Sequence, residues 1–262
     1  MADPFTARRT ALHARLIEAL VRAFLGLPDW RDPAPFVAVA VPILRGAQTA
    51  MVGLTDAAIA AMLTRALRTP VAPAALDPAP IIDAVRSEVT PEQAYRRPFD
   101  DLWTALHEDR PLTEAVELGT VRLREIAETD LQITYSHAAR AALTRSPAAD
   151  KVTGWRRVLR RSESCALCVI ASTQRYHVGD LNPVHPGCDC EVEPITSADR
   201  HVIDRALLDA ASKAAEDFTG SYPTREQLRD VLLSITREHG EHGPVLVDPR
   251  HRFTGPGDPP TA

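Results

Sequence analysis

The chain has 262 residues, with 30 Lys and Arg against 35 Asp and Glu, which gives a formal net charge of −5. This length suits one or two domains that can bury a sizeable core. Hydrophobic residues make up 45% of the chain but aromatic residues only 5%, and Ala is abundant. That balance favours Ala-rich helices and largely excludes an all-β fold.

The sequence predicts no membrane span, because no run of eighteen or more uninterrupted apolar residues occurs. The most apolar stretch, Ala34 to Leu44, contains Pro35 and Pro42. The N-terminal residues follow an amphipathic pattern, not the apolar run and small-residue cleavage site of a secretory signal. We therefore expect a cytosolic product.

The first part of the chain reads as helical. Apolar residues recur at helical spacing from Thr6 to Leu27, which predicts one amphipathic helix. The apolar segment Pro35 to Arg68 is interrupted by Pro42 and Gly53, so we expect two helices there. Thr69 to Pro80 holds four Pro residues and predicts a connector.

Two further helices are predicted in the middle of the chain. Thr90-Pro91-Glu92-Gln93 is a strong helix start, with Thr90 as the cap and Gln93 returning a bond to it, and this helix should end near Asp109. Pro111 then opens the longest helical pattern, which closes at Ser146-Pro147. A helix of about 33 residues is roughly 50 Å long, so it should act as a spine.

The character of the sequence changes after Pro147. Strands are expected at Gly154–Arg160 and Cys190–Ile195, and an edge strand at Pro244–Phe253. Capped helices are expected after Thr196 and from Thr224 to Gly240. The Gly- and Pro-rich residues Thr254–Ala262 are predicted to be disordered.

All four Cys residues fall within 26 positions, in the arrangement Cys165-x2-Cys168, sixteen residues, then His185-x2-Cys188-x-Cys190. Two tight groups of soft ligands separated by a loop are the layout that a tetrahedral structural zinc site requires. The chain offers five potential ligands for the four coordination positions of the zinc ion. Cys165 and Cys168 are the safest ligands, and two or more of the remaining three donors complete the set.

The cysteines could also have roles other than zinc binding. Reduced core Cys without metal and redox or catalytic Cys remain alternatives. A thioredoxin-like site needs one isolated Cys-x-x-Cys pair, and here Cys188 and Cys190 accompany it. Zinc nucleobase deaminases place His-x-Glu before Pro-Cys-x-x-Cys, whereas His239-Gly240-Glu241 follows the Cys pair. No other catalytic motif is present, so we expect no enzyme.

Basic and imidazole side chains outside these blocks give weaker signals. A run of arginines beside the Cys/His blocks could contact phosphates, although a solvated or partner-facing strand is at least as consistent with the negative net charge. The histidines near the C-terminus are interpreted as exposed polar loop residues that could approach a site or a partner. The arginines are Arg156, Arg157, Arg160 and Arg161, and the histidines are His239, His242 and His251.

Two stretches together resemble a known family. Gly154-Trp155-x-Arg157-Val158, the Cys165-x2-Cys168 pair and His185-Pro186-x-Cys188-x-Cys190 resemble the C-terminal module of the Mu F-like minor head proteins of tailed phages. The stretch His239-Gly240-Glu241-x-Gly243-Pro244-Val245-Leu246 is similar to the variant found in phages of actinobacteria. The resemblance covers residues 153–256.

The resemblance implies a virion protein inside the head near the portal, acting in head assembly, with a role in DNA packaging or ejection left open. It implies the portal, the major capsid protein or the scaffold protein as partners, and the host cytoplasm as the place of assembly. Where a maturation protease activity accompanies such proteins, this chain departs from it, because no separate protease region is present. No small-molecule substrate is expected.

The combined interpretation is a predominantly α-helical α+β protein. We expect a helical N-terminal region, a long connecting helix, a zinc-stabilised α+β module and a disordered tail, at residues 1–110, 111–147, 148–253 and 254–262. The main alternative function is a zinc-containing DNA-binding protein that uses the Arg156 to Arg161 run. A processing enzyme or toxin is a weaker alternative.

Overall fold

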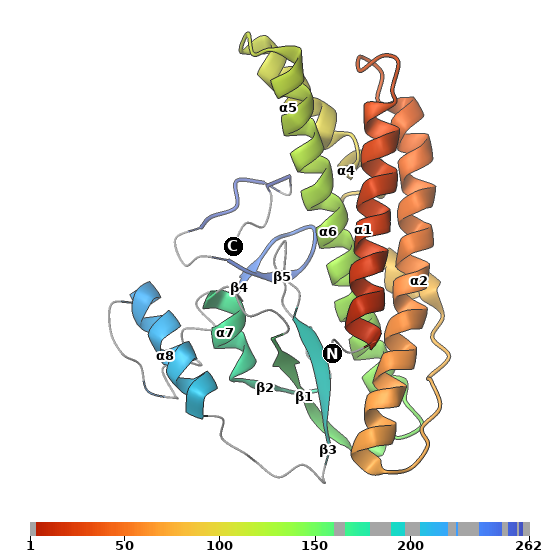
Figure 1. Cartoon of the computed structure of the whole chain (residues 1–262), viewed down its shortest axis with the longest axis vertical. Helices are drawn as coiled ribbons and strands as arrows, with labels where there is room; N and C mark the ends of the chain where they lie inside the picture. Colours follow the sequence, from red (N-terminus) through yellow and green to blue (C-terminus); the bar gives the residue numbers. More distant parts are fainter. Residues whose placement is uncertain are drawn as a thin grey trace.

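The computed structural model describes residues 4–159, 166–178, 190–196, 205–219, 224, 236–247, 251–255 and 257–258. It is an α+β structure in which long helices form a helical body and a small mixed module lies beside it (Figure 1). The predominantly helical α+β class predicted from composition is confirmed.

Three long helices build the helical body: α1 (Pro4–Leu25), α2 (Ala34–Leu67) and α6 (Leu112–Arg145). They lie side by side, and each contacts the other two (Figure 1). The link between α1 and α2 is short, so these two helices run antiparallel. Apolar side chains at helical spacing, such as Leu16, Leu20 and Leu44, fill the space between them.

The prediction of two helices between Pro35 and Arg68 is wrong, because α2 continues through both Pro42 and Gly53. Both residues lie on the exposed face of the helix. The carbonyl that Pro42 leaves without an intrahelical donor can therefore be solvated. On the other face, Val41, Leu44 and Val52 are buried, and this continuous packing holds the helix together.

By length and composition alone, α2 is also apolar enough to cross a membrane. The core helix of a soluble protein meets the same criteria, and 39% of the most apolar window of α2 is buried inside the structure. Polar side chains are buried along it as well. Asp56 accepts hydrogen bonds from the backbone N–H groups of Ala74 and Leu76, at 2.8 and 3.2 Å.

Three short helices follow: α3 (Pro78–Asp83), α4 (Pro91–Ala94) and α5 (Arg97–His107). The capping box at Thr90 and Gln93 is confirmed, with the Thr90 backbone N–H donating to Gln93 Oε1 at 2.9 Å. The single helix predicted up to Asp109 is instead divided into α4 and α5. Pro98 explains the division, because it cannot donate to the carbonyl of Ala94 and is tolerated only in the first turn of a new helix.

The predicted spine helix is confirmed as α6, with 34 residues. It packs against α5, α1 and α2. Gly119 marks the closest approach, since a Cβ there would lie 2.7 Å from the Pro98 carbonyl oxygen and 3.0 Å from the ring of Phe24. Near its end α6 reaches the small module, where the Val192 backbone N–H donates to Tyr135 Oη at 2.6 Å.

The module contains a three-stranded antiparallel sheet in the order β2-β1-β3, formed by β1 (Val152–Val158), β2 (Arg175–Tyr176) and β3 (Glu191–Thr196). A 3-10 turn, η1 (Ala149–Lys151), leads from α6 into it. The strands predicted at 154–160 and 190–195 correspond to β1 and β3. Trp155 anchors the sheet: it is buried, stacks on Tyr176 and donates from Nε1 to the His177 carbonyl at 2.9 Å.

Two helices and a hairpin complete the described part of the module: α7 (Ala166–Ser172), α8 (Arg205–Thr219), β4 (Thr236–Glu238) and β5 (Pro244–Leu246). The edge strand predicted at 244–253 is represented by β5. Residues 236–238 were predicted to be helical, but they form β4 and pair with β5. The remainder of the helix predicted from Thr224 lies outside the described residues.

The start of the predicted disordered tail has defined contacts. Thr254 Oγ1 donates to Asp258 Oδ1 at 3.1 Å, and Arg122 on α6 donates to the Gly257 carbonyl. The Asp258 carbonyl lies 2.8 Å from Nε2 of His239. The described residues between 254 and 258 are therefore held against α6 and the β4–β5 hairpin.

Candidate metal centre

Two of the five predicted zinc ligands lie in the described part of the chain, and the structure brings them together. Cys168 is on α7 and Cys190 immediately precedes β3. Their residues are 2% and 0% exposed, and both belong to one small buried cluster against which Leu159 packs. One cysteine from each Cys/His block therefore contributes to the same cluster, as a shared metal centre requires.

The sheet explains why these cysteines meet. β1 and β3 pair antiparallel, with Val158 opposite Glu191, so the end of β1 lies beside the start of β3. The helix α7 also contacts β1. Cys190 comes just before Glu191, and Cys168 comes from α7, so both reach the same end of the sheet.

The start of β3 is also tied directly to the helical body. Arg9 on α1 donates to the Cys190 carbonyl at 3.0 Å, and its guanidinium lies 5.0 Å from the centre of the Tyr135 ring. Thr6 Oγ1 donates to Glu191 Oε1 at 2.7 Å. Because Tyr135 receives the Val192 N–H as well, the cysteine cluster and the helix–module contact are parts of one structure.

The other predicted ligands, Cys165, His185 and Cys188, lie outside the described residues. Two buried thiol side chains in one cluster fit a thiolate zinc site, and deprotonated Cys sulfur is the preferred zinc ligand. The full ligand set and the metal remain predictions.

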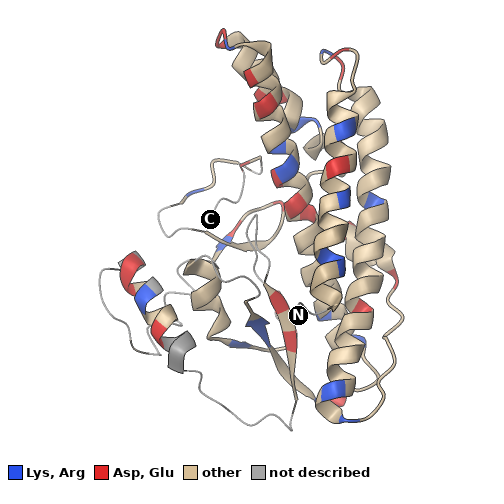
Figure 2. Cartoon of the chain, viewed as in Figure 1, with Lys and Arg blue, Asp and Glu red and all other residues tan. Residues whose placement is uncertain are grey.

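The arginine run predicted for phosphate contact is divided between the two faces of β1. Arg156 is exposed and its guanidinium pairs with Glu193 on β3, at 2.7 Å from NH2 to Oε2. Arg157, the next residue, is 2% exposed. Alternation along a strand sends the two side chains to opposite faces. Figure 2 shows acidic residues on β3 beside the basic residues of β1 and β2. Arg160 and Arg161 lie outside the described residues.

A second polar cluster lies where the β4–β5 hairpin meets the helical body. The interpretation of His239 and His242 as exposed loop residues is wrong, because they are 4% and 7% exposed. The loop between β4 and β5 packs on the segment that follows α3, and the Ser87 N–H donates to the Glu241 carbonyl at 2.9 Å. The Ser87 hydroxyl donates to the Gly240 carbonyl.

Buried charges hold this contact. Glu241 is fully buried and pairs with Arg86 and with Arg97, the latter at 2.9 Å from NH1 to Oε2. Arg86 also pairs with the buried Asp130 of α6, at 2.5 Å. Burial raises the pKa of Asp130, while the positive charge of Arg86 opposes that shift. Two guanidinium groups thus face two carboxylates in a site that is largely closed to water.

Sequence reasoning missed this cluster. The sequence His239-Gly240-Glu241-His242-Gly243 indicates a turn rich in ligand-type side chains, but neither its difference from the deaminase motif nor its family resemblance predicts that these side chains are buried together. Arg86 and Asp130 carried no signal, because their pairing joins residues 44 positions apart. Only the folded chain shows that these charges meet.

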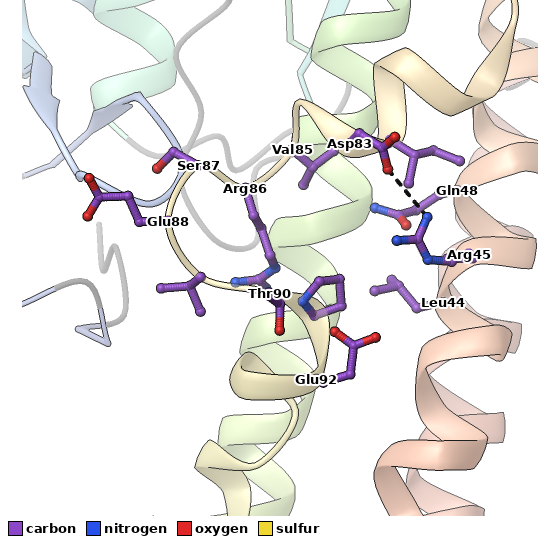
Figure 3. A pocket seen from close by; sticks show the side chains of 13 residues that line it. Leu44, Arg45, Gln48, Asp83, Val85, Arg86, Ser87, Glu88, Thr90 and Glu92 are labelled. Atoms are coloured by element: carbon purple, nitrogen blue, oxygen red, sulfur yellow. Dashed lines mark hydrogen bonds and ion pairs between the residues drawn. The ribbon is translucent and has the colours of Figure 1, made fainter.

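A cavity of about 280 Å³ lies next to this cluster, between α2, α3 and the segment leading to α4 (Figure 3). Its lining includes charges of both signs, among them Arg45, Arg86 and Glu92. Arg45 is paired with Asp83 at 3.5 Å across one side of the cavity. Arg86 therefore contributes both to the cavity wall and to the buried ion pairs.

Comparison with protein-family models, with curated proteins and with solved structures finds no match to this chain.

Proposed function

We propose that this protein is a non-enzymatic minor head protein of a tailed phage, located in the virion interior near the portal, with a structural zinc site. The support is the Mu F-like pattern of residues 153–256 together with one structural observation. Cys168 and Cys190, one from each Cys/His block of that pattern, lie in one buried cluster at the contact between module and helices.

The zinc would have a structural role in this proposal. Cys190 would hold the start of β3, whose backbone and Glu191 side chain bond to α1 and α6. A bound Zn²⁺ would supply coordination bonds that fix the end of the sheet. Thr6, Arg9 and Tyr135 then orient β3 against the helices.

The helical body offers a surface for assembly. Six large apolar side chains are exposed among the described residues, and they lie on helices α1, α2, α5 and α6. We term this set of six exposed residues the distal patch: Leu25, Val39, Leu106, Leu112, Leu118 and Val121. Leu118 and Val121 are three residues apart on α6 and so lie on one face of it, and neighbouring exposed apolar residues are typical of protein contact surfaces. The portal, the major capsid protein or the scaffold protein would be the partner.

The DNA-binding alternative has less support. Of the four arginines in the run, Arg156 is paired with Glu193 and Arg157 is buried. Phosphate contact would then depend on Arg160 and Arg161, with a contribution from Arg156 only if it leaves Glu193. Salt-dependent retention of the protein on DNA would favour this alternative.

The proposal is tested by head assembly. The protein should be found in purified phage heads and should copurify with the portal or capsid proteins when these are produced together. The double variant Leu112→Glu/Leu118→Glu should fold with an unchanged circular dichroism spectrum but lose this association. A matched variant, Ala50→Glu/Ala57→Glu, adds the same two charges at exposed positions in the middle of α2, outside the distal patch, and should retain it. Normal association of the Leu variant would exclude the distal patch as the contact surface. Absence of the protein from heads would overturn the proposed function.

A further inference from the structure

The turn between β4 and β5 gathers three metal-ligand side chains. Gly240 and Gly243 have positive φ angles of 82° and 73°, and the His239 N–H donates to the Gly243 carbonyl at 3.0 Å. This tight turn directs His239, Glu241 and His242 to one place, where their ligand atoms all lie within 4.8 Å of one another. All three side chains are buried.

Both histidines are oriented by backbone carbonyls. His239 Nε2 lies 2.8 Å from the Asp258 carbonyl oxygen, and His242 Nδ1 lies 3.4 Å from the Val85 carbonyl oxygen. A carbonyl only accepts, so the proton must be on the contacting nitrogen of each ring. The other nitrogens, His239 Nδ1 and His242 Nε2, are then lone-pair donors. Metal-binding histidines are held in the same way, by a second-shell acceptor on the far nitrogen.

The lone-pair atoms have few competing partners. His239 Nδ1 is buried and has no hydrogen-bond partner among the residues that the structure describes. His242 Nε2 lies 3.8 Å from Glu241 Oε1, too far for a hydrogen bond. Burial lowers the pKa of both histidines, which keeps them in the neutral form that a metal requires.

We propose that His239, Glu241 and His242 form a second metal site, which binds Zn²⁺ through two imidazole nitrogens and one carboxylate oxygen. Two nitrogen donors favour zinc over Ca²⁺ or Mg²⁺, which prefer all-oxygen sites. Three protein ligands leave a fourth position for water. Arg86 and Arg97 pair with the same carboxylate, so this site is weaker than the thiolate site and fills after it. The proposal stands independently of the proposed phage function.

The test uses the full-length protein, stripped with a chelator and titrated with Zn²⁺ or Co²⁺. Elemental analysis should show two metal equivalents, of which one is lost in His239→Gln and in His242→Gln and none in the nearby control His251→Gln. With Co²⁺, the sulfur-to-metal absorption of the thiolate site should persist in both His→Gln variants. Unchanged stoichiometry in the two variants would overturn the proposal.

Arg97 provides a variant with the opposite effect. Its side chain is only 17% exposed and its guanidinium lies 2.9 Å from the Glu241 carboxylate, so Arg97→Met removes a cation that competes with the metal. The affinity of the histidine site for zinc should then rise by about tenfold or more.

X-ray absorption spectroscopy tests the site in the wild-type protein without any variant. Compared with the spectrum at one zinc equivalent, the spectrum at two equivalents should show added nitrogen and oxygen ligands only. A second zinc with sulfur ligands, or no second zinc, would contradict the site.

Discussion

At the scale of single residues, close contacts decide which substitutions the fold accepts. Gly119 shows this most clearly, since it lies in the third turn of α6, opposite α5 and Phe24. A glycine inside a helix normally lowers stability by about 0.5–1 kcal/mol relative to Ala. At this position the lack of a Cβ allows α5 to approach closely. A Cβ at residue 119 would lie 2.7 Å from the Pro98 carbonyl oxygen, which belongs to the rigid backbone.

We therefore expect Gly119→Ala to lower the free energy of unfolding by about 1–3 kcal/mol, because overpacking against backbone cannot be relieved by a side-chain rotation. The matched control is Gly53→Ala in α2, where a Cβ would meet nothing within 4 Å. That control should be neutral or gain up to about 1 kcal/mol. Urea denaturation of both variants measures the difference, and an equal gain in both would show that α5 moves away freely.

At the scale of elements, the β4–β5 hairpin is held on the helical body by charges that the fold buries. Arg86 is the centre of this contact, because it pairs with Asp130 of α6 and with Glu241 of the hairpin loop. The hairpin itself is short, with three residues in each strand. Such a hairpin is not stable alone, so its position depends on these contacts.

Arg86→Met should lower the free energy of unfolding by about 3–5 kcal/mol, because it leaves Asp130 buried without its cation and Glu241 with Arg97 only. Arg156→Met is the control, since the pair between Arg156 and Glu193 is exposed and should contribute less than about 1 kcal/mol. Thermal or chemical denaturation compares the two. Equal small losses would show that the buried pairs contribute little to the docking of the hairpin.

The elements also show what the sequence can predict. Periodicity and capping residues located α1, α6 and the capping box at Thr90, because these signals are local. The same reasoning failed at Pro42, where tertiary burial on one face of α2 outweighs the lost hydrogen bond, and at residues 236–238, where pairing with β5 decides the structure. At the site, spacing predicted that the two Cys blocks converge. It did not reveal Arg9, Arg86 or Asp130, whose partners are distant in sequence.

At the scale of the whole molecule, two of the contacts between the described residues of the helical body and of the module depend on buried polar groups. One is the start of β3, where Arg9 and Tyr135 hold the backbone of Cys190 and Val192. The other is the hairpin loop at Arg86 and Glu241. The first lies beside the predicted thiolate zinc site and the second contains the proposed histidine site. Metal binding at either place would therefore stabilise the contact between the two parts.

Removal of the proposed thiolate zinc should consequently loosen the module while the helical body stays folded. Structural zinc sites contribute on the order of 10 kcal/mol to folding, which is enough to order a segment with a small core of its own. The Val192 amide, which donates to Tyr135, should lose its protection from hydrogen exchange when zinc is stripped or in Cys168→Ser. Amides in the centre of α2 should stay protected, and added zinc should restore Val192 only in the wild type. Full protection of Val192 in a zinc-free protein would refute a structural role for the metal, because the bonds from β3 to α1, α6 and β1 would then hold the strand in place without it.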